Sequence, residues 1–372
     1  NLNTKSTRLA NAIAFDVREK GRIKRKGHPV IGEIVKDQKG NPKTIPGSLK
    51  NVKAIGWYIE EFGISQISMN LTNINETPVH IVFQEVIKKA DKRGVRITGS
   101  EIVGLIPLKS MLDTGKYFLK KQNRSIGIPE KDIIDIAIES LGLNQVKKFT
   151  PEKNIIEYFL NSLANDKKKN IELTASEFSD EVTRESPAPG GGSVSAYVGS
   201  LGASLGAMVA NLSSNKRGWE NQVEMFSHIA DQINVIRNEL LLLVDEDSNA
   251  FNMIMLAFKL PNNSEKEKKI RLKSINESTI YAAKVPLKVM EKSYECYDLI
   301  LKLAKEGNQN SISDAGVACL CVYTAIYGAY LNVKINLKDL PNDKSIIERA
   351  NDILVKSSTK KRNILNYIQG II

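Results

Sequence analysis

The sequence predicts an α+β domain followed by an all-α helical bundle, and three observations support this prediction. The chain has 372 residues, which is more than most single domains contain. Strand-like and helix-like patterns alternate up to about Val146, and from Glu177 onward helical periodicity replaces the strand patterns. We therefore expect the first domain over residues 1–145, a linker over 146–171 and the second domain over 172–372.

The first domain is predicted from seven segments. Apolar residues at helical spacing predict helices, and short apolar runs rich in β-branched residues predict strands. The predicted helices cover residues 6–20, 77–93, 107–121 and 130–140, and the predicted strands cover residues 52–59, 64–71 and 95–102. This mixed order is typical of a βα sandwich, which we expect to be ferredoxin-like. In the linker we expect one short helix at 155–163, before a run of lysines.

The second domain is predicted to be helical throughout. Its predicted helices cover residues 179–185, 194–212, 220–258, 264–306, 313–331 and 344–369. We expect Pro261 and Pro286 to break or kink what would otherwise be very long helices, because proline lacks the N–H group that a helix interior needs.

The segment 194–212 is the only one that we judge long and uncharged enough to raise the question of a membrane span. Small residues recur in it at a four-residue step, which lets neighbouring helices approach closely. They are Ser195, Gly199, Ala203 and Ala207. A helix that is apolar on all sides also occurs in the core of a large soluble domain, so we predict a buried helix and no membrane partner.

Composition and charge limit the class of protein. Hydrophobic residues make up 42% of the chain, which is enough for real cores, and the net charge of +11 raises the question of nucleic-acid binding. The lysines are spread along the chain, and no pattern of stacking aromatics or of a recognition helix accompanies them. We therefore expect no nucleic-acid partner, and an acidic small-molecule substrate fits the charge equally well.

The cysteines and the first residues of the chain indicate where in the cell we expect the protein. Cys296, Cys319 and Cys321 lack the spacing of a metal site and are odd in number, so we expect reduced thiols and no metal. The chain opens on polar residues without a hydrophobic stretch, so no signal peptide is expected and a cytoplasmic location is favoured. Because the first residue is Asn1, we expect a processed chain or a fragment.

The most informative local motif is a glycine-rich turn in front of the 194–212 helix. Glycine adopts backbone angles closed to other residues, and serine is a favoured N-cap, so we expect Ser193 to cap this helix. Such a turn points backbone N–H groups outward at the positive end of a helix dipole, which suits an anionic or electron-rich ligand. The alternative is a flexible interdomain linker. The motif consists of Pro187, Ala188, Pro189, Gly190, Gly191, Gly192 and Ser193.

A carboxylate interrupts the apolar stripe of the 220–258 helix. Steps of three and four residues connect Leu240, Val244 and Phe251, and they predict an apolar side chain at position 247, where the sequence has an aspartate. Asp247 is thus predicted to face inward, where a lone carboxylate is costly. Three interpretations stay open: a structural ion pair, an acceptor for a neighbouring helix end, or a catalytic base whose pKa is raised by burial. Asp245 lies about 200° around the helix and is predicted to face solvent.

Other candidate residues are weaker. Lys259 ends the same helix, where a cation is favourable, and it can also reach toward an anionic substrate tail. Asp314 is most simply an acidic residue in the first turn of a helix. His28, His80 and His228 share no spacing typical of a metal site or a catalytic triad.

Several motifs in one order resemble the formiminotransferase–cyclodeaminase family. Those similar to its cyclodeaminase domain are SPAPGGGS (186–193), LVDEDSNAF (243–251), KLPNN (259–263), VPL (285–287), SDAGVA (313–318) and GAYLNVKINL (328–337). Those similar to the C-terminal subdomain of its transferase half are VKAIGWY (52–58), QISMNL (66–71), TPVH (77–80) and GSEIVGLIP (99–107). The resemblance covers nearly the whole chain.

The resemblance implies a formimidoyltetrahydrofolate cyclodeaminase, which converts 5-formiminotetrahydrofolate to 5,10-methenyltetrahydrofolate and ammonia. It implies part of a bifunctional enzyme of histidine degradation and one-carbon metabolism, with tetrahydrofolate as the substrate carrier, no metal and a polyglutamylated folate as partner. It also implies a dimer-based homo-oligomer with sites at subunit interfaces, for which the 194–212 helix is the candidate packing face. The family's proton-accepting aspartate corresponds to Asp247. The substrate-binding residues that we expect are Pro189, Gly190, Gly191, Gly192, Ser193, Lys259 and Asp314.

The resemblance further implies a missing part. In this family the transferase half has two subdomains, and the N-terminal one carries the catalytic histidine. The first three residues of this chain resemble the tail of the strand that opens the second subdomain, so we expect the N-terminal subdomain to be absent and formimino transfer to be incomplete. Neither His28 nor His80 is assigned that role. The alternative functions are a methenyltetrahydrofolate cyclohydrolase and a non-catalytic folate-binding or assembly module.

Overall fold

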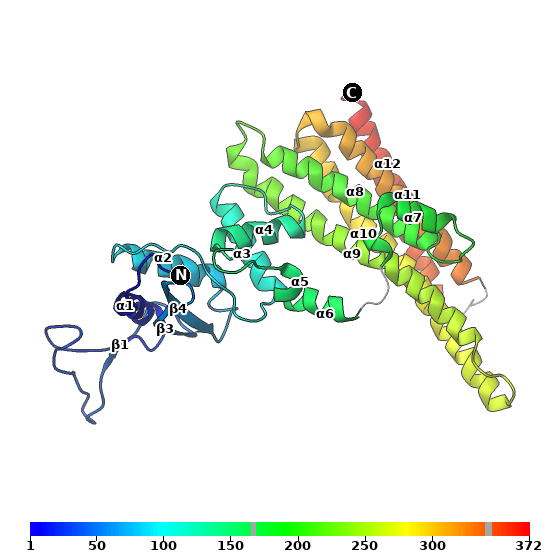
Figure 1. The fold of residues 1–372 in the computed structure, drawn as a ribbon. Helices are drawn as coiled ribbons and strands as arrows, with labels where there is room; N and C mark the ends of the chain where they lie inside the picture. Colours follow the sequence, from blue (N-terminus) through cyan, green and yellow to red (C-terminus); the bar gives the residue numbers. More distant parts are fainter. Residues whose placement is uncertain (165–168, 339–343) are drawn as a thin grey trace. The chain divides into compact units, whose positions relative to one another are not determined.

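The computed structural model describes residues 1–164, 169–338 and 344–372 (Figure 1). The chain divides into two compact units, one made of residues 1–122 with 130–165 and the other of residues 123–129 with 166–372. The first unit combines helices with short sheets, and the described part of the second is helical. The predicted order, α+β followed by all-α, is therefore confirmed.

The sheet of the first unit is built on one antiparallel strand pair. Strands β3 (Val52–Ile59) and β4 (Ile64–Leu71) pair over their whole length, with Val52 opposite Leu71. Both strands end where the sequence predicted. Helix α1 (Thr7–Val17) covers one face, and its backbone comes so close to Gly56 that a Cβ there would lie 2.3 Å from the carbonyl carbon of Ala10. A glycine is therefore needed under this helix.

One predicted strand is wrong. Residues 95–102 form no strand, and of them only Ile97 makes an isolated bridge, to Leu2, which also bridges Ser65 of β4. The apolar residues there satisfied the strand pattern, but a strand also needs a partner along its length. An unpredicted short pair lies elsewhere, between β1 (Arg22–Ile23) and β2 (Thr44–Ile45). The ferredoxin-like arrangement of this unit stays a prediction.

The other helices of the first unit are α2 (Val79–Asp91), α3 (Leu108–Lys121), α4 (Glu130–Leu141), α5 (Pro151–Asn154) and α6 (Ile156–Ala164). The first part of the predicted linker is folded into this unit, since Ile155 is fully buried in a cluster with Ile106, Met111 and Ile134. Lys167 and Lys168 of the lysine run predicted there lie outside the described residues.

The second unit consists mainly of long helices. Its elements are η1 (Asn170–Glu172), α7 (Ala175–Thr183), α8 (Gly191–Ser214), η2 (Glu220–Gln222), α9 (Val223–Phe258), α10 (Glu265–Glu306), η3 (Gln309–Ser311), α11 (Ile312–Asn336) and α12 (Lys344–Gln369). Pro261 lies between α9 and α10, as a helix-breaking residue should. Pro286 does not break α10, which continues across it to Glu306.

Helix α8 packs against α9, α10 and α11 in this unit. Its small residues permit the close approach that their spacing predicted. A Cβ on Gly199 would lie 2.9 Å from Ser293 Oγ of α10, and one on Gly202 would lie 3.0 Å from the carbonyl oxygen of Ala318 in α11. Three helices therefore fix the position of α8.

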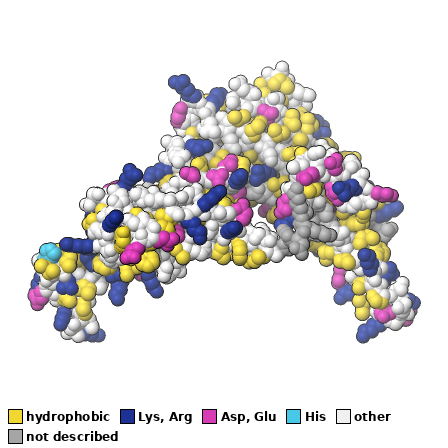
Figure 2. All heavy atoms as spheres, viewed as in Figure 1, with side chains coloured by type: hydrophobic (Ala, Val, Ile, Leu, Met, Phe, Trp, Pro, Cys, Tyr) yellow, Lys and Arg dark blue, Asp and Glu magenta, His cyan; other side chains and the backbone are white. Residues whose placement is uncertain are grey.

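Two helical segments of the described chain are long and apolar enough to cross a membrane, Gly191–Ser214 and Gln309–Asn336. The sequence prediction recognised only the first and is corrected on this point. Of their most apolar windows, 61% and 44% respectively are buried inside the structure. Core helices of soluble proteins pass the same test, so this finding is weak evidence for a span. On the face shown in Figure 2, Lys and Arg side chains are scattered over both units.

Candidate functional site

The inward-facing carboxylate of α9 lies against the first turn of α8. Asp247 is partly buried, and it lies so close to Gly192 that a Cβ on that glycine would be 2.1 Å from Asp247 Oδ1. No side chain larger than hydrogen fits between them. The structure thus brings together the two features that the sequence singled out independently, the glycine-rich turn and the misplaced aspartate.

Ser193 does not cap α8, contrary to the sequence prediction. The helix begins at Gly191 with Gly190 as its N-cap, and Ser193 is the third residue of the first turn. Its hydroxyl is fully buried and donates a hydrogen bond to Asp247 Oδ2 over 3.0 Å. The three glycines let the helix begin earlier than a serine cap would allow, and this frees the hydroxyl to bind the carboxylate.

Two opposing effects act on the pKa of Asp247. Burial raises it, because a low-dielectric environment disfavours the charged form. The hydroxyl and the backbone N–H of Ser193 act in the opposite direction by donating to the carboxylate. Burial wins, and the net pKa lies above the ordinary value. A carboxyl with a raised pKa is a better proton acceptor once ionised, which suits a general base.

This geometry narrows the three interpretations of Asp247. It is an acceptor at the end of a neighbouring helix, and the ion-pair interpretation finds no support, since no cation of the described chain contributes to its pKa. The role of a catalytic base is compatible with the acceptor role, because a carboxylate offers about four lone-pair positions and Ser193 uses only some of them.

The prediction that Asp245 faces solvent is wrong. Asp245 is partly buried, and its Oδ1 accepts a hydrogen bond of 2.7 Å from the backbone N–H of Asn170. The Asn170 side chain donates to Ser248 Oγ over 3.1 Å, and Ser248 Oγ lies 3.2 Å from Ser193 Oγ. The short helix η1, which carries Asn170, supplies a partner that helical periodicity within α9 cannot reveal.

The remaining residues of the turn flank this site. Pro189 is buried, Gly190 is half-buried and Gly191 is exposed. Gly191 lies beside Asn332 of α11, whose amide nitrogen would be 3.2 Å from a Cβ on that glycine. Asn332 belongs to one of the motifs that carry the family resemblance, yet no sequence pattern singled it out.

Lys259 and Asp314 are not brought into the site within one chain. Lys259 is exposed and follows Asp247 by twelve residues of helix, or about 18 Å. Helix α11 runs antiparallel to α8, with Asn332 beside Gly191 and Ala318 beside Gly202. Asp314 precedes Asn332 by eighteen residues, so it lies roughly 27 Å away, toward the other end of the bundle.

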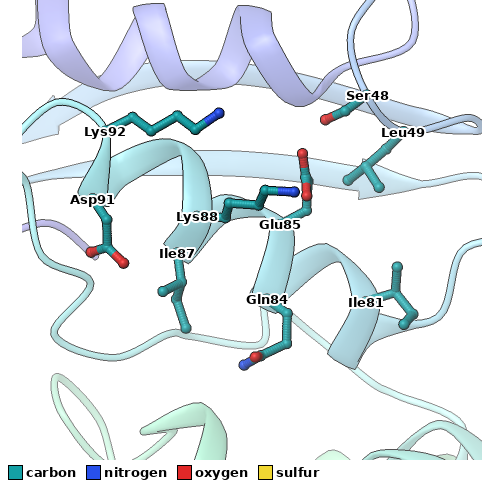
Figure 3. Close-up of a pocket in the computed structure, with 9 residues that line it drawn as sticks. All are labelled: Ser48, Leu49, Ile81, Gln84, Glu85, Ile87, Lys88, Asp91 and Lys92. Carbon is teal, nitrogen blue, oxygen red and sulfur yellow. The ribbon is translucent and has the colours of Figure 1, made fainter.

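Two pockets lie away from the contact between Asp247 and the first turn of α8. One, of about 480 Å³, lies between α9 and α10 and is lined by Glu239, Leu242, Leu243, Glu246, Tyr281, Lys284, Val285 and Lys288. The other, of about 690 Å³, lies in the first unit along α2 (Figure 3). Its lining mixes the apolar Leu49, Ile81 and Ile87 with charged side chains, and it contains none of the predicted site residues. The described residues contain no cluster of three or more metal-binding side chains.

Comparisons with known proteins match both units. A family model described as formiminotransferase-cyclodeaminase matches residues 174–354, and one described as formiminotransferase domain matches residues 1–161. The formimidoyltransferase-cyclodeaminase of Gallus gallus is 36% identical over 345 residues, which are 92% of this chain and 60% of that protein. This chain therefore spans less than two thirds of that relative.

Two further matches each cover about half of this chain. The methenyltetrahydrofolate cyclohydrolase of Methylorubrum extorquens is 34% identical over 180 residues, covering 48% of this chain and 86% of that protein. The crystal structure of formiminotetrahydrofolate cyclodeaminase from Thermotoga maritima matches with a TM-score of 0.46 at 28% identity, covering 53% of this chain and 94% of that one.

The match at the amino-terminal end corrects one expectation. We expected the N-terminal part of the transferase to be absent, but a formiminotransferase domain is present and its match begins at residue 1. The expectation depended on the resemblance of the first three residues to the strand that opens the second subdomain and on the lack of a counterpart to the catalytic histidine, whereas a domain is identified by the pattern along its whole length.

Proposed function

This chain belongs to the formiminotransferase-cyclodeaminase family, and we propose that its helical unit is a formimidoyltetrahydrofolate cyclodeaminase. The observation that carries the proposal is a partly buried carboxylate with a raised pKa, held by Ser193 at the start of α8. The proposed substrate is 5-formiminotetrahydrofolate, and the products are 5,10-methenyltetrahydrofolate and ammonia. Polyglutamylated folate is the proposed physiological form, and the proposed location is cytoplasmic.

The reaction needs a proton acceptor at one nitrogen and a proton donor at another. N10 of the folate attacks the carbon of the formimino group, whose nitrogen is protonated, and forms a new carbon–nitrogen bond, so N10 must lose its proton. The carbon–nitrogen bond to the formimino nitrogen then breaks, and ammonia leaves with one proton more than that nitrogen carried. We assign to Asp247 the acceptance of the N10 proton, which can then pass to the departing nitrogen. The product is a cation, which a nearby carboxylate also stabilises.

The proposal is tested by incubating the chain with 5-formiminotetrahydrofolate and following methenyl-folate absorbance and ammonia together. We expect both products in equal amounts, and we expect Asp247→Asn to lower kcat by at least about 10²-fold with unchanged folding. Near-normal turnover by the variant would contradict the catalytic assignment. Folate binding without ammonia release would favour a non-catalytic folate-binding module.

A second candidate function is that of a methenyltetrahydrofolate cyclohydrolase, which the Methylorubrum extorquens relative favours. The two activities share the methenyl compound, as product in one case and as substrate in the other. Supplying 5,10-methenyltetrahydrofolate alone separates them: a cyclohydrolase consumes it with loss of absorbance, and a cyclodeaminase leaves it largely unchanged.

We also propose that the helical unit forms a homodimer through one face of α8 and α11. On each helix, exposed apolar side chains recur at helical spacing and form a line. The residues of these lines are Leu201, Met208 and Leu212 on α8, and Val317, Leu320, Tyr327, Leu331 and Ile335 on α11. Apolar lines of this length are unusual on the surface of a monomer and mark interaction sites.

The two lines lie on the same side of the unit. Gly202 of α8 points toward α11, and Cys321 of α11 points toward α8. At about 100° per residue, the residues of each line are displaced by roughly 40–120° from that direction, with the same sense of rotation. Because the helices are antiparallel, equal rotations bring both lines to one face. A second copy of the chain with the same face supplies a matching apolar surface.

A further inference from the structure

We propose that Asn170, Ser248 and Ser193 form a directed chain of hydrogen bonds that orients the Asp247 carboxylate as the proton acceptor, with Asn170 and Ser248 as positioning residues. This inference rests on the proposed function and assigns a role to two residues that lie outside the glycine-rich turn. Three distances define the chain: 3.1 Å from Asn170 Nδ2 to Ser248 Oγ, 3.2 Å between the two serine oxygens, and 3.0 Å from Ser193 Oγ to Asp247 Oδ2.

The chemistry of the groups fixes the direction of the chain. The Asn170 side-chain nitrogen can only donate, so Ser248 Oγ accepts from it and its own proton is free to point to Ser193. An ionised carboxylate can only accept, so the Ser193 proton must point to Asp247. Each proton is therefore directed toward the carboxylate. Hydrogen bonds in such a chain polarise one another, which strengthens the last bond.

The other aspartate of the motif fixes the start of the chain. Asp245 Oδ1 accepts from the backbone N–H of Asn170 over 2.7 Å, and this bond holds η1 against α9. The two aspartates thus lie at opposite ends of the hydrogen-bond chain. Asp245 holds the segment that carries the first donor, Asn170, and Asp247 is the final acceptor. Ser248 and Ser193 are both buried, so water does not compete for the central bond.

The chain opposes the effect of burial on Asp247. Burial raises the pKa of this carboxyl and the Ser193 donors lower it, so loss of the chain should raise the pKa further. Ionisable groups on the surrounding elements include Glu172 on η1, Tyr197 on α8, Asp245 and Glu246 on α9, Tyr281 and Lys284 on α10, and Lys334 on α11. Glu246 contacts Tyr281, Asp245 binds Asn170, and Glu172 accepts from the Lys169 N–H. Burial raises the pKa of Asp247, and the two hydrogen bonds from Ser193 lower it.

The test compares the pH profiles of kcat/KM for the wild-type chain, Ser248→Ala and Asn170→Ala. We expect the acidic limb to move to higher pH by about half a unit or more in both variants, and kcat to fall about 3–10-fold, because a charge-assisted bond is weakened. The matched control is Ser227→Ala, which removes another buried α9 hydroxyl that accepts from the Ile126 N–H. It lies twenty residues, or about 30 Å, from Asp247, and its pH profile should equal that of the wild type. Acidic limbs that stay in place in both variants would overturn the proposal.

A measurement without substrate separates this inference from the proposed function. The pKa of the Asp247 carboxyl is read by NMR of the chain labelled with aspartate carrying ¹³C at Cγ, and Asp247→Asn identifies the signal. We expect a higher pKa in Ser248→Ala and in Asn170→Ala than in the wild type. If the wild-type chain releases no ammonia but this shift is present, the proposed reaction fails and the hydrogen-bond chain stands. An unchanged pKa with full activity would reject the chain alone.

Discussion

At the scale of single residues, the ionised carboxylate of Asp247 lowers the free energy of unfolding. Its pKa is raised by burial, so the folded protein holds this proton more tightly than the unfolded chain, whose aspartate pKa is about 3.9. As the pH rises above about 4, the unfolded state ionises first and the free energy of unfolding falls until the folded carboxyl has also ionised. The proposed catalytic role of Asp247 and the stability of the fold therefore conflict at this residue.

This conflict predicts that Asp247→Asn raises the thermal unfolding midpoint of the helical unit at pH 7.5 by about 2–4 °C. The gain should disappear below about pH 4, where both states of the wild-type aspartate are protonated. Differential scanning calorimetry at the two pH values checks the prediction. A midpoint that is equal to the wild type or lower at pH 7.5 would contradict it.

Gly192 is predicted to be essential for activity because it has no side chain. In Gly192→Ala the new methyl group would lie 2.1 Å from Asp247 Oδ1, so the carboxylate must move away from Ser193. We expect kcat to fall at least about 10²-fold, since a displacement near 1 Å is that costly. The control is Gly316→Ala in α11, where the nearest atom would be 3.5 Å away and helix propensity improves. Similar kinetics for the two variants would speak against the close contact.

The sequence predicted the central residue of the site better than its partners. Asp247 interrupts a periodic apolar stripe, so periodicity alone identified it. Ser193 was recognised but expected to be an N-cap, because the preceding glycines do not reveal where the helix begins. No sequence pattern indicated Asn170, because its role depends on a contact with Ser248 of α9, which is 78 residues away in sequence.

At the scale of elements, α8 is predicted to tolerate little volume on its packed side. In Gly199→Val the added atoms would meet Ser293 Oγ, Ala325 Cβ and Leu240, which come from three helices that cannot all retreat. We expect the free energy of unfolding of the helical unit to fall by about 1–3 kcal/mol. Gly206→Ala should cost less, because its nearest neighbour is the flexible end of Ile233 at 3.3 Å.

The two tryptophans allow the free energy of unfolding of the helical unit to be measured in the whole chain. Trp57 lies in the first unit and Trp219 in the second. In a Trp57→Phe background, fluorescence during urea unfolding reports the helical unit alone. Equal midpoints for Gly199→Val and the unsubstituted background would show that α8 can shift without cost.

Elements were predicted best where local patterns suffice. Strands β3 and β4 have the predicted ends because their apolar runs are bounded by turn residues on both sides, and α12 matches its predicted range. The prediction of a strand at 95–102 was wrong because strand formation depends on a pairing partner that is distant in sequence. Helix α7 begins at Ala175, earlier than predicted, because Thr174 and Glu177 form a capping box.

At the scale of the whole molecule, the proposed homodimer predicts the effect of charged substitutions on α11. Leu320→Asp combined with Leu331→Asp places two carboxylates in the apolar face and should dissociate the dimer, because buried unpaired charges are costly. The control is Val355→Asp on α12, an exposed apolar residue outside both lines. Size-exclusion chromatography with light scattering gives the mass of each variant. A monomeric wild type, or a dimeric double variant, would reject this face.

Helix α8 carries outward-facing residues of the proposed dimer face and, in its first turn, the hydroxyl that holds Asp247. A partner that packs against this helix therefore also affects how firmly Ser193 holds the carboxylate of Asp247. Specific activity would then not be a constant of the preparation. It would decline on dilution below the dissociation constant of the dimer, and it would recover on concentration without any change in the covalent structure.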